Sequence, residues 1–246
     1  MKEREYQGPD SRAVQQMFAR IAHRYDFLNH LLSASVDRHW REAAVNKLRE
    51  LVVSVSPSML CLDVCSGTGD LAVALHRGLK SRVVALDFCH PMLTRAKAKM
   101  KAAGVAPSIQ NIEGDTLGLP FANRSFDAVT IAFGLRNLED FRRGLQEMHR
   151  VLKPGGALVI LEFSRPVVPV LKHIFNFYFR CILPKLGAAI SGDGIAYQYL
   201  PDSVWKFPTQ VELAAVMRAV GFQQVDYVNL TGGVATLHSA ILARTP

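Results

Sequence analysis

Cysteine is scarce in this sequence, and the cysteines present match neither a disulfide framework nor a zinc motif. The four are Cys61, Cys65, Cys89 and Cys181. No second pair of cysteines or histidines follows Cys61 and Cys65, and the histidines elsewhere show no ligand spacing, so no metal is expected. This use of cysteine favours a reducing compartment.

Long apolar runs and targeting signals are also missing. No stretch reaches the roughly 18 apolar residues that a membrane-spanning helix needs. Residues 1–12, MKEREYQGPDSR, are charged and polar, unlike a secretory signal peptide. We therefore expect a cytoplasmic protein, either free or peripheral at the inner face of a membrane.

The chain does have enough apolar residues for a sizeable core. Of its 246 residues, 49% are hydrophobic and 20% are charged, which argues against disorder as the main state. Basic residues outnumber acidic residues by 29 to 21. Such a surface attracts nucleic acid or an anionic membrane, or it serves only solubility. Because no basic tract interleaved with aromatic residues occurs outside 163–192, no nucleic-acid partner is expected.

Apolar runs alternate with helical segments through most of the chain. The strand-like runs are 59–64, 82–87, 126–132 and 157–162. The helical segments between them are 70–79, 90–103 and 138–151. This alternation predicts an α/β fold, in which βαβ units build a parallel sheet that is covered on both faces.

The two ends of the chain depart from this alternation. Residues 11–54 have apolar residues at helical spacing, which predicts helices there. Near the C-terminus, Thr209 and Glu212 form a capping box that opens a helix, and Gly221 closes it. Two last strand candidates, 224–229 and 237–242, are expected to form an antiparallel hairpin at the edge of the sheet.

A glycine-rich loop follows the first predicted strand. Residues 67–72, GTGDLA, match G-x-G-x-x-A between a strand and a helix, with Gly67, Thr68 and Gly69 leading the motif. Asp87 lies twenty residues after Gly67, where a carboxylate can accept hydrogen bonds from both ribose hydroxyls of an adenosine. These residues alone separate NAD from S-adenosylmethionine poorly.

Other strand-end residues favour S-adenosylmethionine. Asp63 ends the first strand, where a carboxylate attracts the cationic groups of that cofactor and repels a pyrophosphate. Asp115 and Thr116 follow the third strand, where they can hold an adenine amino group. Segments 119–121, 125–127 and 152–156 resemble the class I methyltransferase pattern. We add Ala132, at the end of the fourth strand, to the predicted cofactor-binding residues.

Several further motifs resemble those of the C-methyltransferases of menaquinone and ubiquinone biosynthesis, in the expected order over nearly the whole chain. They are 25–29 (YDFLN) with 39–40 (HW), 133–137 (FGLRN), 150–156 (RVLKPGG) with 162–164 (EFS), 199–203 (YLPDS) and 232–238 (GGVATLH). Leu28 departs from the family's usual methionine, an exchange that conserves bulk, and Ser66 is a mild variant.

The resemblance implies a Rossmann-like class I methyltransferase with a mostly parallel seven-stranded sheet. It implies an N-terminal helical lid over 1–55 and a catalytic domain over 56–246, in which a segment of about 165–205 forms part of the substrate pocket. The implied substrate-binding residues are Asn29, Trp40, Tyr199 and His238.

The reaction implied is methyl transfer from S-adenosylmethionine to a ring carbon of a prenylated quinol. Demethylmenaquinol is the first candidate substrate, and the demethylated ubiquinol precursor is the second. Three alternatives remain: a methyltransferase for another small molecule or RNA, an NAD-dependent oxidoreductase, and a non-catalytic scaffold. Asp63 argues against the oxidoreductase.

Three residues are candidates for catalysis. A quinol has a phenol-like pKa near 10, so its ring carbon attacks well only when the hydroxyl is deprotonated or bonded to a base. Arg136 can stabilise the developing phenolate, Asn137 can orient a hydroxyl or water, and Tyr25 can bring the lid over the site. Alternatively, Arg136 caps a helix or pairs with Glu139 or Asp140, and Tyr25 is a core residue of the lid.

Residues 163–192 contain no acidic residue but several basic and aromatic ones. Such a segment is suited to bind an anionic bilayer surface or to form an apolar pocket entrance that accepts an isoprenoid tail. It also suits a helix that packs across the sheet or in a homodimer interface. Transient membrane contact and a homodimer are both kept as predictions.

Overall fold

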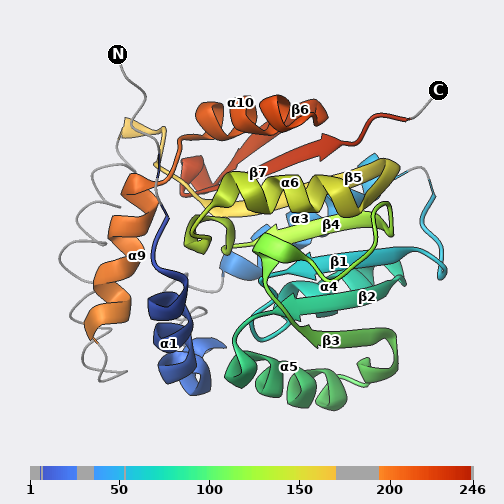
Figure 1. The fold of residues 1–246 in the computed structure, drawn as a ribbon, viewed down its shortest axis with the longest axis horizontal. Helices are drawn as coiled ribbons and strands as arrows, with labels where there is room; N and C mark the ends of the chain where they lie inside the picture. The colour runs from blue at the N-terminus through green and yellow to red at the C-terminus, as the bar shows by residue number, and fades with distance from the viewer. Residues whose placement is uncertain (1–5, 7, 27–35, 53, 170–193, 245–246) are drawn as a thin grey trace.

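A seven-stranded sheet lies at the centre of the computed structural model, with helices on both faces (Figure 1). The structure describes residues 6, 8–26, 36–52, 54–169 and 194–244. The strands are β1 (Leu60–Val64), β2 (Arg82–Asp87), β3 (Ile109–Glu113), β4 (Phe126–Ala132), β5 (Leu152–Phe163), β6 (Gln223–Leu230) and β7 (Ala235–Ile241).

The helices alternate with these strands through the middle of the chain. The α-helices are α1 (Ser11–Ile21), α3 (Val36–Leu51), α4 (Asp70–Leu79), α5 (His90–Ala102), α6 (Phe141–Val151), α9 (Gly194–Lys206) and α10 (Gln210–Val220). Short 3-10 turns are η1 (Ala22–Arg24), η2 (Ala106–Ser108), η3 (Thr116–Gly118), η4 (Leu135–Asn137) and η6 (Thr231–Gly233).

The strand order is β3-β2-β1-β4-β5-β7-β6. Strands β1 to β5 pair in parallel, whereas β7 runs antiparallel to both β5 and β6. The predicted α/β fold, with its mostly parallel seven-stranded sheet and antiparallel C-terminal pair, is confirmed. In such a sheet the carboxyl ends of β1 to β4 meet at one edge, which is where ligands of open α/β sheets bind.

Most predicted elements are confirmed, and the differences have local causes. β2 and β4 have the bounds that their apolar runs predict. β5 begins at Leu152 instead of 157, because Leu152 pairs with Phe126 ahead of a register shift. α6 begins at Phe141 instead of 138, because the Asp140 side chain caps it by accepting a hydrogen bond from the Arg143 N–H at 3.0 Å. The Thr209 capping box is present as predicted.

Two hydrophobic layers hold the helices against the sheet. One joins α6 and α10 to its first face, through buried residues such as Leu145, Met148 and Met217. The other joins α3, α4 and α5 to its second face, through residues such as Leu48 and Leu75. Burial on both faces explains why β1, β2 and β4 are nearly continuous apolar runs.

The N-terminal helix and α9 lie together at the carboxyl edge of the parallel strands. α1 contacts both α5 and α9 there (Figure 1). Asp10 starts α1 by accepting a hydrogen bond from the Ala13 N–H at 2.8 Å. Among the described residues, no helix is long and apolar enough to cross a membrane.

Candidate active site

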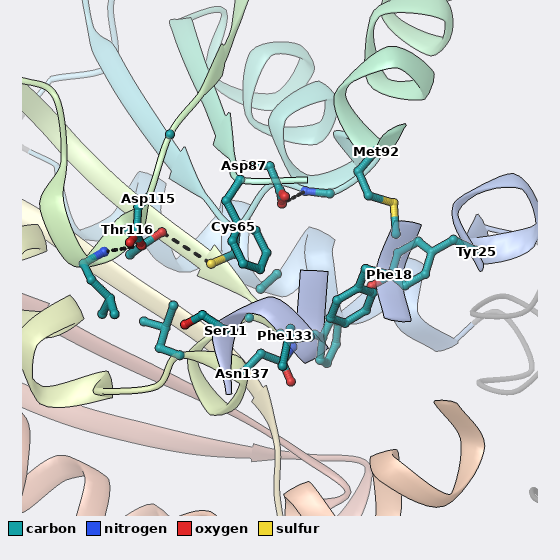
Figure 2. Close-up of a pocket in the computed structure, with 18 residues that line it drawn as sticks. Ser11, Phe18, Tyr25, Cys65, Asp87, Met92, Asp115, Thr116, Phe133 and Asn137 are labelled. Atoms are coloured by element: carbon teal, nitrogen blue, oxygen red, sulfur yellow. Dashed lines mark hydrogen bonds between the residues drawn. The ribbon is translucent and has the colours of Figure 1, made fainter. Parts of the chain in front are cut away.

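A pocket opens at the carboxyl edge of the sheet, between the strand ends and α1 (Figure 2). It holds about 650 Å³ of empty space, including its mouth. Its lining residues come from the N-terminal part of the chain and from the loops after β1 to β4. They are Ser11, Val14, Phe18, Tyr25, Cys65, Gly67, Asp87, Phe88, Met92, Gly114, Asp115, Thr116, Leu117, Ala132, Phe133, Gly134, Asn137 and Leu138.

The glycine loop turns sharply out of β1 to form one wall of this pocket. Cys65, Gly67 and Gly69 all have positive φ, at 51°, 55° and 82°. The left-handed φ of Gly69 disfavours any residue with a side chain, and a Cβ atom there would also lie 2.5 Å from the Met100 Cε atom of α5, which would have to move. The loop is fixed at its start by the Ser66 N–H, which donates to the Leu86 carbonyl at 3.0 Å. Gly67, which has no side chain, presents only backbone atoms to the pocket.

Asp87 ends β2 and lines the pocket, as the sequence predicts. Its Oδ2 accepts a hydrogen bond from the Gly67 N–H at 2.8 Å, and its Oδ1 accepts one from the Cys89 N–H at 2.8 Å. Burial raises the pKa of this carboxyl, and the backbone donors oppose the shift. Each carboxylate oxygen has a second acceptor position, so the group can still bind ligand hydroxyls.

Asp63 is the next-to-last residue of β1, just before the glycine loop; it is 1% exposed and does not line the pocket. Its Oδ1 accepts a hydrogen bond from the Thr130 hydroxyl at 2.8 Å, whereas its buried Oδ2 has no partner. Burial raises the pKa of Asp63 to about 7, the Thr130 hydrogen bond opposes the shift, and the nearby Asp87 charge adds to it. The Ser66 hydroxyl is a second buried polar group without a partner at this point of the loop.

The loops after β3 and β4 complete the far wall of the pocket. Asp115 caps η3 by accepting a hydrogen bond from the Leu117 N–H at 2.8 Å. The hydroxyl of Thr116 lies 3.5 Å from the sulfur of Cys65, which joins this loop to the glycine loop (Figure 2). Ala132 also lines the pocket. Three strand-end positions predicted from the sequence therefore meet around one cavity.

The N-terminal part of the chain forms the remaining wall; we call its described residues, 6 and 8–26, the N-terminal cover. Phe18 reaches the pocket from α1, and Tyr25 reaches it from the position directly after η1 (Figure 2). Val14 of α1 also lines the pocket. Phe18 and Tyr25 contact each other edge to face, with ring centroids 5.9 Å apart. The Gln15 side chain donates to the Phe88 carbonyl at 2.6 Å, which fastens the cover to the loop after β2.

Asn137 faces the pocket from the end of η4. Its Oδ1 accepts a hydrogen bond from the Tyr199 hydroxyl at 2.8 Å, and its Nδ2 donates to the Phe133 carbonyl at 3.2 Å. Burial raises the pKa of Tyr199 to about 12, so this hydroxyl stays protonated at neutral pH. Tyr199 and Asn137, predicted from different motifs, are thus brought together.

Arg136, in contrast, does not line the pocket. It is 5% exposed, and its Nη1 lies 2.6 Å from the Glu162 Oε1 atom and 2.6 Å from the Phe133 carbonyl. Its backbone N–H also donates to the Glu162 carboxylate at 3.2 Å. The sequence-based alternative of a pair with Glu139 or Asp140 is wrong, because the partner lies at the end of β5.

The remaining predicted residues lie elsewhere. Trp40 is buried behind Phe133, with ring centroids 6.0 Å apart, and donates to the Thr231 hydroxyl at 2.9 Å. His238 is buried in β7, where its Nε2 lies 2.9 Å from the Gln210 carbonyl. Neither lines the pocket. Asn29 lies outside the described residues.

Thr68 does not line the pocket either. Its side chain makes contacts that the sequence did not predict. Its hydroxyl donates to the Asp26 Oδ1 atom at 2.5 Å and accepts from the Lys99 ammonium at 3.0 Å. Glu162, Asp26 and Lys99 were not predicted as site residues. Glu162 and Asp26 did carry signals, since Glu162 ends an apolar strand at the ligand edge of the sheet and Asp26 lies in the motif 25–29.

Comparison with known proteins shows one consistent resemblance. The profile of the ubiE/COQ5 methyltransferase family matches residues 6–242. A demethylmenaquinone methyltransferase of Deinococcus radiodurans is 48% identical, over 91% of this chain and 90% of that protein. The ubiquinone/menaquinone biosynthesis C-methyltransferase UbiE of Geotalea daltonii is 44% identical, over 92% and 94%.

Solved structures share the fold at low sequence identity. The [4+2]-cyclase SpnF superposes with a TM-score of 0.71 at 16% identity, covering 98% of this chain and 99% of that one. A methyltransferase of Thermotoga maritima that depends on S-adenosylmethionine superposes at 0.62 and 17% identity, covering 93% and 99%. Since one of the two is a [4+2]-cyclase, the fold alone does not fix the reaction.

Proposed function

The chain belongs to the ubiE/COQ5 methyltransferase family, and from that premise we propose that it transfers a methyl group from S-adenosylmethionine to a ring carbon of a prenylated quinol. Demethylmenaquinol is the first candidate substrate, because relatives at 41 to 48% identity carry the name demethylmenaquinone methyltransferase. The demethylated ubiquinol precursor is the second, because other relatives are named for both quinones.

The observation that carries the proposal is the set of three carboxylates at successive strand ends. Asp87 and Asp115 line the pocket at the ends of β2 and β3, and Asp63 lies buried near the end of β1, just before the glycine loop that forms one wall. An adenosine with a cationic tail offers a positive group, two ribose hydroxyls and an adenine amino group, all of which carboxylates bind. A pyrophosphate would be repelled by the same groups.

The residues present fit S-adenosylmethionine. The Oδ2 atom of Asp63 and the Ser66 hydroxyl are buried without partners beside the glycine loop, and a cationic amino group and a carboxylate would satisfy them. When bound, the cofactor supplies a methyl group already activated on a sulfonium. Gly67 lets its ligand approach the loop closely, and Ala132 and Thr116 form the opposite wall.

Asn137 is the described residue best suited to hold the quinol. One hydrogen of its Nδ2 is used by the Phe133 carbonyl and its Oδ1 is used by Tyr199, which leaves the second Nδ2 hydrogen for a ligand oxygen. A donor placed there stabilises negative charge on the quinol oxygen as the ring carbon attacks. Tyr199 fixes the orientation of this carboxamide.

Arg136 acts in this proposal as a positioning residue. Its charge is compensated by Glu162, and its guanidinium holds the Phe133 carbonyl that also anchors Asn137. The buried ion pair therefore fixes η4 and the loop after β4. This differs from direct stabilisation of the phenolate, because no atom of Arg136 lines the pocket.

Further parts of the proposal concern the molecule around the site. The position of the N-terminal cover over the pocket supports the proposed division into a helical lid over residues 1–55 and a catalytic domain over 56–246, with part of 165–205 enclosing the substrate.

The basic aromatic segment 163–192, which lies largely outside the described residues, would bring the protein to the inner face of a membrane, where its prenylated substrate resides. A homodimer is part of the same proposal.

Methyl transfer from labelled cofactor to demethylmenaquinol and to the ubiquinol precursor, side by side, tests the function. We expect label in the first product, or in both. Label in neither product, from protein that still binds S-adenosylhomocysteine, would contradict the proposal and favour a scaffold. Asn137→Ala further separates an enzyme from a scaffold. If the protein is an enzyme, this variant should lose turnover and retain its affinity for the cofactor.

A further inference from the structure

Lys99, on α5, lies between acidic residues of two other elements. Its Nζ atom is 2.7 Å from the Asp26 Oδ2 atom and 2.5 Å from the Asp70 Oδ1 atom. The same ammonium donates to the Thr68 hydroxyl at 3.0 Å. All three donor positions of the ammonium are therefore occupied within one cluster.

The cluster closes on itself, which distinguishes it from an isolated surface pair. The Thr68 hydroxyl donates to the other oxygen of Asp26 at 2.5 Å. Asp70 also lies 3.5 Å from Arg41, so it is held from α3 as well. The side chains of Lys99, Asp26 and Asp70 are 27%, 33% and 25% exposed. Partly buried networks of this kind are worth more than exposed pairs.

The cluster lies where the N-terminal cover meets the glycine loop, so it can affect the pocket between them. Asp26 is the last residue of the N-terminal cover and directly follows Tyr25, which lines the pocket. The Tyr25 side chain lies close to the glycine loop, since its Cε1 atom is 3.9 Å from the place that a Cβ atom on Gly67 would occupy. Thr68 and Asp70 belong to the glycine loop and the first turn of α4. Lys99 thus fastens the end of the cover to the loop beneath it.

We propose that Lys99 is a positioning residue that holds the N-terminal cover closed over the cofactor pocket, through its simultaneous contacts with Asp26, Thr68 and Asp70. The inference rests on the proposed function, since it takes this pocket to be the cofactor site. The cover supplies one wall of the pocket, so exchange of the cofactor requires Asp26 to part from Lys99 and Thr68. Loss of the cluster weakens retention of the cofactor without altering the groups that would face the quinol.

The test compares two lysines of the same helix. Lys99→Met is expected to raise the Kd of S-adenosylhomocysteine in calorimetry, and the KM for S-adenosylmethionine, about tenfold, with kcat at saturating cofactor within about twofold. Lys97→Met is the matched control, because Lys97 is exposed on α5 and makes none of these contacts, and it should leave Kd unchanged. Lys99→Arg, which retains the charge and the donors, should restore most of the affinity.

Asp26→Asn provides the second arm. If Lys99 acts through Asp26, the single variants each lose affinity and the double variant is no worse than either alone. Hydrogen exchange across 8–26 should be slowed by S-adenosylhomocysteine in the wild type and much less in Lys99→Met. Unchanged Kd in Lys99→Met, additive losses in the double variant, or a fall in kcat with Kd retained would each overturn the inference. The calorimetric binding and hydrogen-exchange measurements need no quinol. They would therefore test the role of Lys99 even if methyl transfer to both quinols failed.

Discussion

Lowering the pH is expected to weaken cofactor binding through Asp63. The buried Oδ2 atom of this carboxylate has no partner, and burial raises the pKa of Asp63 to about 7. The carboxyl is then about nine-tenths ionised at pH 8 and about one-tenth ionised at pH 6. A cationic amino group binds the ionised form, so the affinity for S-adenosylhomocysteine should fall about tenfold between these two values.

The stability of the ligand-free protein should change in the opposite direction. The pKa of Asp63 is raised from 3.8 to about 7, so the folded state binds this proton more tightly than the unfolded chain does. The stabilisation from this group is therefore fully present below about pH 3.8 and is lost as the pH rises through 7. The difference between the two pKa values corresponds to about 4 kcal/mol, an upper limit.

Asp63→Asn isolates the effect. The variant should bind S-adenosylhomocysteine at least about tenfold more weakly at pH 8, with little dependence on pH between about 6 and 8, in titration calorimetry. Asp127→Asn is a matched control, because Asp127 lies in β4 and pairs with Lys153 away from the pocket. A wild-type Kd that is constant over this range, or an Asp63→Asn variant that binds like the wild type, would refute the reasoning.

Three further predictions concern other parts of the molecule. Glu162→Gln leaves the Arg136 charge buried without its carboxylate and should lower the free energy of unfolding by about 3–5 kcal/mol in urea denaturation, and an unchanged midpoint would count against the ion pair. Tyr199→Phe frees the Asn137 carboxamide and should lower kcat about tenfold with cofactor affinity retained, whereas a loss of affinity alone would place Tyr199 in the cofactor site. Arg180→Glu combined with Lys172→Glu should weaken flotation with anionic vesicles, and equal flotation would remove the membrane role.

The cofactor half of the site could be predicted because its determinants are local in sequence. Asp63 is the next-to-last residue of β1, Asp87 is the last residue of β2, and Asp115 lies two residues after β3. The apolar runs of β1 and β2 show where those two strands end. Parallel pairing then brings the ends of neighbouring strands together without further information. The role of Thr68 was less predictable, because its partners Asp26 and Lys99 lie 42 and 31 residues away.

The wall around Asn137 could not be assembled in the same way, because its contacts join distant segments. Arg136 pairs with Glu162, 26 residues on, and the nearer acids Glu139 and Asp140 were the natural partners to expect from sequence spacing alone. The Tyr6 hydroxyl reaches the Arg136 carbonyl at 2.7 Å across 130 positions of the chain. Tertiary packing therefore decides which polar groups here are buried and which face the pocket.

These distant contacts also explain why the two halves of the site should be separable by mutation. Asp63 and Asp87 are held by the sheet and the glycine loop, whereas Asn137 is held by Tyr199 and by the Phe133 carbonyl. Among the described residues, no hydrogen bond joins the side chains of the first set to those of the second, and side chains without shared partners usually act additively. Variants at Tyr199 should therefore alter turnover, variants at Asp63 should alter cofactor affinity, and combined variants should show the sum of the two free-energy changes.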